Sequence, residues 1–315
     1  MRALNAGAVT VLVLVGVGAA GCHTRGAGAP GNASAPGRGY DPVTMDPPAR
    51  DSAYPARLAE LAFESSGARL NGIFYLPAGP GPHPVVVLLH GNPGNERNLD
   101  VAQVLRRAGY AALYFNYRGS WGSGGTFSRS HALEDVHAAI RFVRSPLAAE
   151  RYRVDSIRVA LIGHSMGGWL ALLAAAGDQR VGCVGALDFV NTGARGRRLL
   201  SDRVADSART AEDSWLAAPG GPYRVEGGGV ALVAEVKMNA ERWDVLSYAP
   251  ALRKRRVLLI GAANRSEYDS LLVALGGPDA TRVTARWWRT EHSFSDRRLA
   301  LARAILDWVR GPCGL

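Results

Sequence analysis

Cysteine is scarce in this sequence of 315 residues, which contains only Cys22, Cys183 and Cys313. The spacing of these residues matches neither a disulfide-rich framework nor the ligand set of a zinc site. We therefore expect no disulfide framework, no metal and no other cofactor. The chain also lacks an internal repeat, which argues against a repeat architecture.

Aromatic residues are few, at 8% of the chain. Lysine and arginine, mostly arginine, number 37 against 27 acidic residues, which gives a net charge of +10. The arginines are scattered and lack the extended series of interleaved aromatic residues that is typical of a nucleic-acid platform. We expect a solvated basic surface and no nucleic-acid partner. Attraction to anionic envelope lipids is the weaker alternative.

The N-terminus carries an apolar run at residues 8–17, followed by the small residues that lead to Cys22. The run is short for a membrane span, so residues 1–22 are predicted to be a secretory signal. The ending Ala-Ala-Gly-Cys resembles a bacterial lipobox, which implies a lipidated Cys22 and an envelope lipoprotein with a membrane tether. Ordinary cleavage with secretion or release to the periplasm, and an uncleaved anchor, are the alternatives.

Residues 23–50 are rich in Gly, Ala, Pro and Ser and show almost no apolar periodicity, which predicts a flexible tether. Residues 51–315 are predicted to form one globular domain, since 47% of the whole chain is hydrophobic. The pattern is irregular over 191–250, with one helical stretch near 230–242. We expect a lid or insertion there.

One short segment combines a strand, a turn and a helix in the order that a reactive serine requires. The apolar run 157–162 precedes Gly163-His-Ser-Met-Gly-Gly168, and the Ala- and Leu-rich run 169–176 follows. This Gly-x-Ser-x-Gly turn is typical of a nucleophile elbow, which lifts a serine Oγ above the end of a strand. Small flanking residues let the strand and helix approach closely.

Strand and helix patterns alternate through the rest of the domain. An antiparallel hairpin is expected over 58–76, and the closing helix over 299–309. Further strands are expected at 85–90, 110–117, 181–190, 257–260 and 283–287, and further helices at 101–109 and 133–143. With the elbow strand this gives a mostly parallel, doubly wound α/β sheet of about eight strands, whose functional loops lie at the carboxyl ends of the strands.

Four motifs then resemble those of the α/β-hydrolases, most of all the prolyl-oligopeptidase and dienelactone-hydrolase-like branches. They are His90-Gly-Asn-Pro-Gly94, Asn116-Tyr-Arg-Gly-Ser120, Gly163-His-Ser-Met-Gly-Gly168 and Glu291-His-Ser-Phe294, in the chain order that this family uses. The resemblance covers roughly residues 58–309. It implies the α/β-hydrolase fold and a serine-hydrolase mechanism.

The resemblance assigns Ser165 as the nucleophile and His292, after the last strand, as its general base. The oxyanion donors are expected to be the backbone N–H groups of Met166 and Asn92. The other histidines are expected to be structural or solvated: His164 packs beside the elbow, His90 fixes the oxyanion loop, and three more lie in a linker or on a helix, namely His83, His131 and His137.

The acid of the triad is less clear, because Asn264 occupies the place where the family usually has an aspartate after its seventh strand. Glu267 is the preferred candidate and Asp269 the next. Asp188, after the sixth strand, is an alternative geometry known within the fold. Both Glu267 and Asp269 are equally well explained as charges favoured near a helix N-terminus.

The preferred function is hydrolysis of carboxylic esters through a Ser165 acyl-enzyme, with a small-molecule or peptide acyl substrate. A prolyl-oligopeptidase-like peptidase is one alternative, although the chain lacks the long propeller domain common in that family. The other alternative is a catalytically degenerate fold that serves as an envelope binding protein, which the asparagine at position 264 motivates.

Overall fold

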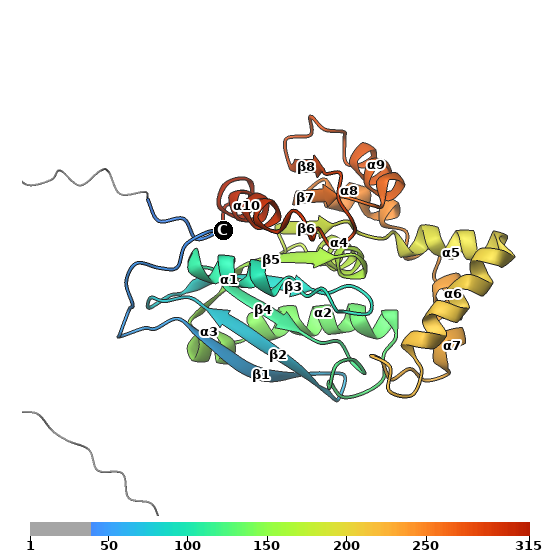
Figure 1. Ribbon diagram of the computed structural model, residues 1–315, viewed down its shortest axis with the longest axis horizontal. Coiled ribbons are helices and arrows are strands. Elements are labelled where there is room, and N and C mark those ends of the chain that lie inside the picture. The colour runs from blue at the N-terminus through green and yellow to red at the C-terminus, as the bar shows by residue number, and fades with distance from the viewer. Residues whose placement is uncertain (1–38) are drawn as a thin grey trace, which may run out of the picture. The chain divides into compact units, whose positions relative to one another are not determined.

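A computed structural model describes residues 39–315, and within them one eight-stranded sheet runs through the molecule in the order β1-β2-β4-β3-β5-β6-β7-β8 (Figure 1). The predicted mostly parallel α/β fold is confirmed. The strands are β1 Arg57–Ser65, β2 Ala68–Leu76, β3 His83–Leu89, β4 Ala111–Phe115, β5 Val154–His164, β6 Cys183–Leu187, β7 Arg256–Gly261 and β8 Val283–Trp287.

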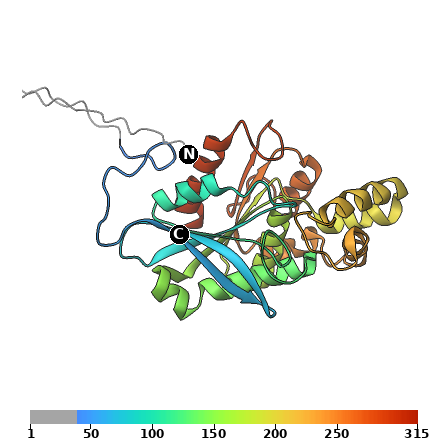
Figure 2. The ribbon, with the colours of Figure 1, turned by 60° about the horizontal axis from the view of Figure 1, so that its bottom comes forward.

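The first two strands form the predicted antiparallel hairpin, which lies along one edge of the sheet (Figure 2). Its turn is Ser66-Gly67, with φ of 46° and 78°, a left-handed pair that suits glycine at the second position. From β4 onward every neighbouring pair in the sheet is parallel. The carboxyl ends of those strands therefore lie at one edge, where ligand sites of open α/β sheets form.

Helices cover both faces of the sheet and divide the core into two apolar clusters. The larger cluster lies under α2 and α4, and the smaller under α1 and α10. The central strand β3 is buried along its whole length, as expected for a parallel strand covered on both faces. The helices concerned are α1 Leu99–Arg107, α2 Arg129–Val143, α4 Met166–Gly177 and α10 Arg298–Trp308.

Four short elements fall outside the predicted pattern: the helix α3 Pro146–Tyr152, the one-turn helices Val245–Tyr248 and Ala249–Leu252, and the helix α9 Arg265–Ala274. α9 follows β7 directly and buries Tyr268 and Leu271. The helix is 10 residues long and has only two buried residues, which are too few to give a periodic hydrophobic pattern in the sequence.

The insertion between β6 and β7 contains three helices of ten or more residues besides two one-turn helices, whereas the sequence predicted one helix. They are α5 Thr192–Ser201, α6 Arg203–Leu216 and α7 Gly228–Met238, and they extend beyond the end of the sheet (Figure 1). In α5, Gly193 and Gly196 allow close packing: a Cβ at Gly193 would lie 2.2 Å from the backbone N of Asp244. This contact between distant segments, invisible to local periodicity, stabilises an arginine-rich helix.

The compact domain begins at Tyr40, so the predicted tether through residue 50 is too long. Val43 is buried against the cluster under α1 and α10, and Asp41 forms an ion pair with Arg303. One buried valine and one ion pair do not produce a periodic hydrophobic pattern, and so the sequence of this segment did not indicate that it belongs to the domain. The predicted signal, the lipidation of Cys22 and the rest of the tether lie outside the described residues. No helix within 39–315 is long and apolar enough to cross a membrane.

Cys183 and Cys313 form a disulfide, which the sequence analysis did not expect. It links β6 to the C-terminal turn across 130 residues of chain. The pairing depends on the tertiary path of α10, which returns the C-terminus to the start of β6, and so the spacing of the cysteines gave no indication of it.

Because a crosslink over so long a loop restricts the unfolded chain, reduction should lower the free energy of unfolding by about 2–4 kcal/mol. Denaturant titration with and without reductant measures this difference. Alkylation of the unreduced, denatured protein should leave Cys183 and Cys313 unlabelled in a peptide map. A Cys183→Ala/Cys313→Ala variant should unfold identically with and without reductant, and labelling of both cysteines without reduction would contradict the pairing.

Candidate active site

Ser165 lies at a sharp turn between β5 and α4, with φ of 58° and ψ of −121°. A non-glycine residue held in such a conformation is strained and needs tight surroundings to keep it there. The neighbouring glycines provide them: a Cβ at Gly163 would lie 2.0 Å from the carbonyl oxygen of Gly167, and one at Gly167 would lie 2.1 Å from that of Leu89. The Gly-x-Ser-x-Gly spacing therefore has a steric cause.

Backbone hydrogen bonds fix the serine at the sheet edge. Its N–H donates to the carbonyl of Leu187 at 2.9 Å, and its own carbonyl accepts from Gly168 at 3.0 Å. The loop after β3 approaches from the other side, since a Cβ at Gly91 would lie 2.8 Å from the Cβ of Ser165. The side chain is thereby enclosed by three loops, each of which follows a parallel strand.

His292 follows β8, and its ring joins the loop after β6. Nδ1 donates a hydrogen bond of 2.6 Å to Oδ2 of Asp188. The Asp188 side chain is fully buried, whereas that of His292 is 39% exposed. With the proton on Nδ1, a neutral imidazole keeps Nε2 as its acceptor, which is the tautomer that a general base needs.

Asp188 is held by donors from the loop after β7. Its Oδ1 accepts from the backbone N–H groups of Ala262, Ala263 and Asn264 at 2.8, 3.0 and 3.0 Å. Burial alone would raise the pKa of this carboxyl, but the hydrogen bond from His292 and the three backbone donors outweigh it and hold the pKa below its ordinary value. Asp188 is therefore a carboxylate at neutral pH, aimed at the imidazole.

The structure corrects the prediction that Glu267 is the carboxylate partner of His292. Its carboxylate accepts from the Ser266 hydroxyl at 2.9 Å in the first turn of α9, and Asp269 pairs with Arg265. Neither carboxylate bonds to His292. Asn264, at the usual acid position, donates its side-chain amide to Asp188 at 3.0 and 3.2 Å. The carboxylate that bonds to His292 thus follows β6, one strand away from the expected place, and Asn264 donates to it.

His164 has a positioning role next to the nucleophile. Its Nε2 bonds to the carbonyl oxygen of His292 at 2.8 Å, and the two rings lie 4.6 Å apart. This bond connects the elbow with the histidine loop across 128 residues. Burial lowers the pKa of His164 to about 4, so its ring is neutral and donates from Nε2.

The remaining histidines have structural contacts. His90 is buried, bonds through Nδ1 to the Gly91 carbonyl at 2.7 Å, and has a pKa lowered to about 4 by burial. His83 bonds to two backbone carbonyls and His131 to the carbonyl of Thr126. Burial lowers the pKa of His137, which lies on α2.

Asn92 and Met166, the residues predicted to be oxyanion donors, lie at the same pocket as the serine. Met166 is the first residue of α4, where a backbone N–H has no acceptor within the helix. The side chains of both residues line the same pocket as Ser165 and His292. The structure thus brings together Ser165, His292, Asn92 and Met166, which are all the predicted site residues except Glu267.

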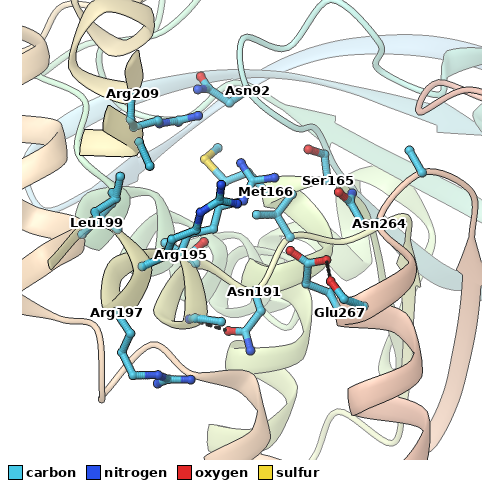
Figure 3. A pocket seen from close by; sticks show the side chains of 18 of the residues that line it. Asn92, Ser165, Met166, Asn191, Arg195, Arg197, Leu199, Arg209, Asn264 and Glu267 are labelled. Carbon is cyan, nitrogen blue, oxygen red and sulfur yellow. Dashed lines mark hydrogen bonds between the residues drawn. The ribbon is translucent and has the colours of Figure 1, made fainter. Parts of the chain in front are cut away.

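The pocket at this edge has a volume of about 1060 Å³. Its far wall is formed by the insertion, from which Arg195 and Leu199 of α5 and Arg209 of α6 project (Figure 3). Ser165 lies on the opposite side, and Asn264 and Glu267 are nearby (Figure 3). Within residues 39–315 no group of three His, Cys, Asp or Glu side chains is placed to hold a metal ion.

A family model described as BD-FAE matches residues 73–193, which run from the second half of β2 past β6 and include the serine turn. Together with the sheet order and the sharp turn at Ser165, this match agrees with the α/β-hydrolase fold. The described domain has the α/β-hydrolase fold.

Solved structures share this fold along most of its length. A thermostable carboxyl esterase from Bacillus coagulans superposes with a TM-score of 0.59 at 17% identity, covering 81% of this α/β-hydrolase and 99% of that chain. An acylaminoacyl peptidase from Pyrococcus horikoshii superposes with a TM-score of 0.57 at 17% identity, covering 81% of this chain and 41% of that chain.

Curated relatives match a shorter segment. An Escherichia coli protein named "Uncharacterized 31.7 kDa protein in traX-finO intergenic region" is 34% identical over 116 residues, which are 35% of this chain and 39% of the relative. The "Quorum-quenching protein AidA" of Acinetobacter baumannii is 32% identical over 131 residues, or 40% and 41%. This α/β-hydrolase therefore spans about two fifths of the length of the curated relatives it matches.

The sequence did contain a signal for Asp188: it is the first polar residue after the buried strand 183–187, at the carboxyl edge of the sheet. Its φ of 39° and its three backbone donors could not be seen there. The roles of Asn264 and His164 were equally hidden, because each depends on a contact with a residue more than 70 positions away.

Replacing Asp188 tests the corrected acid. Asp188→Asn should lower kcat by about 10³- to 10⁴-fold, because an amide cannot stabilise an imidazolium and favours the wrong tautomer. Glu267→Gln should keep kcat on a neutral ester within about threefold. Steady-state turnover of an activated ester measures both, and a loss with Glu267→Gln as large as with Asp188→Asn would contradict the correction.

Acid should destabilise the fold through two buried histidines. The pKa of His164 and of His90 falls from 6.5 to about 4 on folding, so between these values the unfolded chain binds more protons than the folded one. Stability should therefore decrease as the pH falls from 6.5 to 4, with up to about 1.4 kcal/mol lost per pH unit for each histidine. Denaturant titrations across this range measure the slope.

His164→Gln removes one of these titrating groups and keeps a donor for the His292 carbonyl. The free energy of unfolding of this variant should depend less steeply on pH than that of the wild type. The difference in slope should correspond to the uptake of up to one proton fewer on unfolding. A slope unchanged by this substitution would show that His164 is protonated in the folded state.

Proposed function

We propose that this protein is a serine hydrolase of carboxylic esters that acts through an acyl-enzyme on Ser165. The observation that carries the proposal is the 2.6 Å hydrogen bond between His292 and the buried carboxylate of Asp188, at the pocket into which the strained Ser165 opens. A serine hydroxyl needs an adjacent base, and the base needs a group that fixes its tautomer.

In the proposed reaction, His292 Nε2 takes the proton of Ser165 as Oγ attacks the ester carbonyl. Asp188 stabilises the resulting imidazolium, and the N–H groups of Met166 and Asn92 stabilise the oxyanion. The imidazolium then protonates the leaving alcohol. Water attacks the acyl-enzyme with His292 again acting as the base, which releases the acid and regenerates Ser165.

No hydrogen bond joins Ser165 Oγ to His292 within residues 39–315. Catalytic contacts of this kind are often long in the absence of substrate and shorten when it binds. The His164 bond to the His292 carbonyl holds the histidine loop against the serine turn.

A peptidase remains the second candidate, supported by the likeness to the acylaminoacyl peptidase fold. The alternative of a catalytically degenerate binding protein was based on the asparagine at position 264. That basis is removed, because Asp188 supplies the carboxylate that Asn264 lacks. Export as an envelope lipoprotein tethered through Cys22 stays part of the proposal and rests on the sequence alone.

Covalent labelling tests the nucleophile directly. A fluorophosphonate probe should label the wild type and fail to label Ser165→Ala, because only an activated serine reacts with it. Gel fluorescence or intact mass measures the adduct. Ser120→Ala is the matched control, since Ser120 is a buried serine of the β4 loop whose hydroxyl donates to the Tyr117 carbonyl, and this variant should be labelled like the wild type.

Equal labelling of wild type and Ser165→Ala would overturn the assignment. Turnover of p-nitrophenyl acyl esters compared with aminoacyl anilides then separates the two candidate activities. Preference for the anilides would favour the peptidase.

A further inference from the structure

The pocket beside Ser165 carries a marked excess of positive charge. Two glutamates line it, Glu212 and Glu267, against six arginines: Arg129, Arg195, Arg197, Arg198, Arg209 and Arg265. A pocket with low-dielectric walls and one sign of charge concentrates ligands of the opposite sign.

Most of these arginines are already paired with carboxylates. The buried Asp213 lies 3.1 Å from Arg129 and 2.9 Å from Arg209. Three more have carboxylate partners of their own: Arg197 pairs with Asp244, Arg265 with Asp269, and Arg198, more loosely at 3.9 Å, with Asp202. The charges of these five arginines are therefore already balanced by neighbouring carboxylates.

Arg195 differs from the other five. Its guanidinium forms no hydrogen bond and no ion pair with any residue in the range 39–315, although it is only partly exposed. Burial and the nearby charge of Arg209 lower the pKa of its guanidinium, and Glu267 and Glu212 only partly oppose them. A desolvated guanidinium without a partner costs free energy, which a bound anion would recover.

Helix geometry adds to the positive potential. The first turns of three helices line the pocket: Met166 belongs to α4, Thr192 to α5 and Arg265 to α9. Each helix N-terminus carries about half a positive charge, which favours anionic groups. The unpaired Arg195 lies on one of them and is directed into the pocket (Figure 3).

We propose that Arg195 determines specificity by binding an anionic oxygen group of the substrate, a carboxylate or a phosphate, while Ser165 attacks the ester. The proposal rests on the proposed function and narrows its substrate class to anionic esters. A guanidinium matches either group with two parallel N–H donors.

Matched pairs of esters test this preference. One pair differs in the acyl part, p-nitrophenyl hemiglutarate against p-nitrophenyl hexanoate. The other differs in the leaving group, p-carboxyphenyl acetate against p-carbamoylphenyl acetate. In at least one pair the anionic ester should have the higher kcat/KM, by about tenfold or more, and high salt should reduce this preference.

Arg195→Gln should lower kcat/KM for the preferred anionic ester by about 10- to 100-fold, mainly through KM, and change that of its neutral match by less than about twofold. Arg195→Lys should retain part of the preference, because it keeps the charge without the fork. Arg203→Gln is the matched control for net charge: Arg203 is exposed on α6 and outside the pocket lining. It should behave like the wild type.

Glu267→Gln should act in the opposite direction and increase kcat/KM for the anionic ester, because it removes a carboxylate that attracts Arg195. A preference for neutral esters in both pairs, or an equal loss on both members with Arg195→Gln, would overturn the inference and leave the serine-hydrolase proposal intact.

Binding separates the inference from the reaction. Calorimetry with Ser165→Ala should detect glutarate or inorganic phosphate, and the stronger of the two identifies the group. Ser165→Ala/Arg195→Gln should bind that anion at least about tenfold more weakly. Binding of neither anion, or binding unchanged by Arg195→Gln, would reject the anion site whatever the turnover shows. Binding without any ester turnover or probe labelling would instead reject the proposed function alone.

Discussion

The hydrogen bond between Asp188 and His292 joins two loops that are 104 residues apart in the chain. It is possible only because β6, β7 and β8 are parallel neighbours, so that their carboxyl ends meet at one edge. The loop after β7 lies between the other two and supplies the backbone donors that keep Asp188 ionised. Removal of any of these three strands would separate the base from its acid.

The serine turn depends on the same edge in a different way. Its strained backbone is held by close packing of β5, α4 and the loop after β3, where glycines leave no room for a Cβ. His164 then couples this rigid turn to the histidine loop through a single backbone carbonyl. Rigid placement of the serine and electrostatic placement of the histidine are thus two separate constraints that meet in one pocket.

The insertion after β6 supplies the far wall of the pocket, which the sheet alone does not form. Its helices close the pocket and bring a group of arginines, most of which are neutralised by carboxylates within the insertion or next to it. Arg195 remains without such a partner. In the function that we propose, the sheet provides the chemistry and the insertion provides selectivity, a division that follows from loops being freer to vary than packed strands.

Much of this could be read from the sequence because local rules carried it. The serine turn, the hairpin and the buried strands have residue patterns that only a few conformations satisfy, and they gave the fold and Ser165. His292 was assigned from the resemblance to the α/β-hydrolases. The acid, the roles of Asn264 and His164, the disulfide and the pairing state of each arginine were decided by tertiary structure. Each of these depends on contacts between residues far apart in the chain, and local patterns of hydrophobicity do not encode which distant side chains meet.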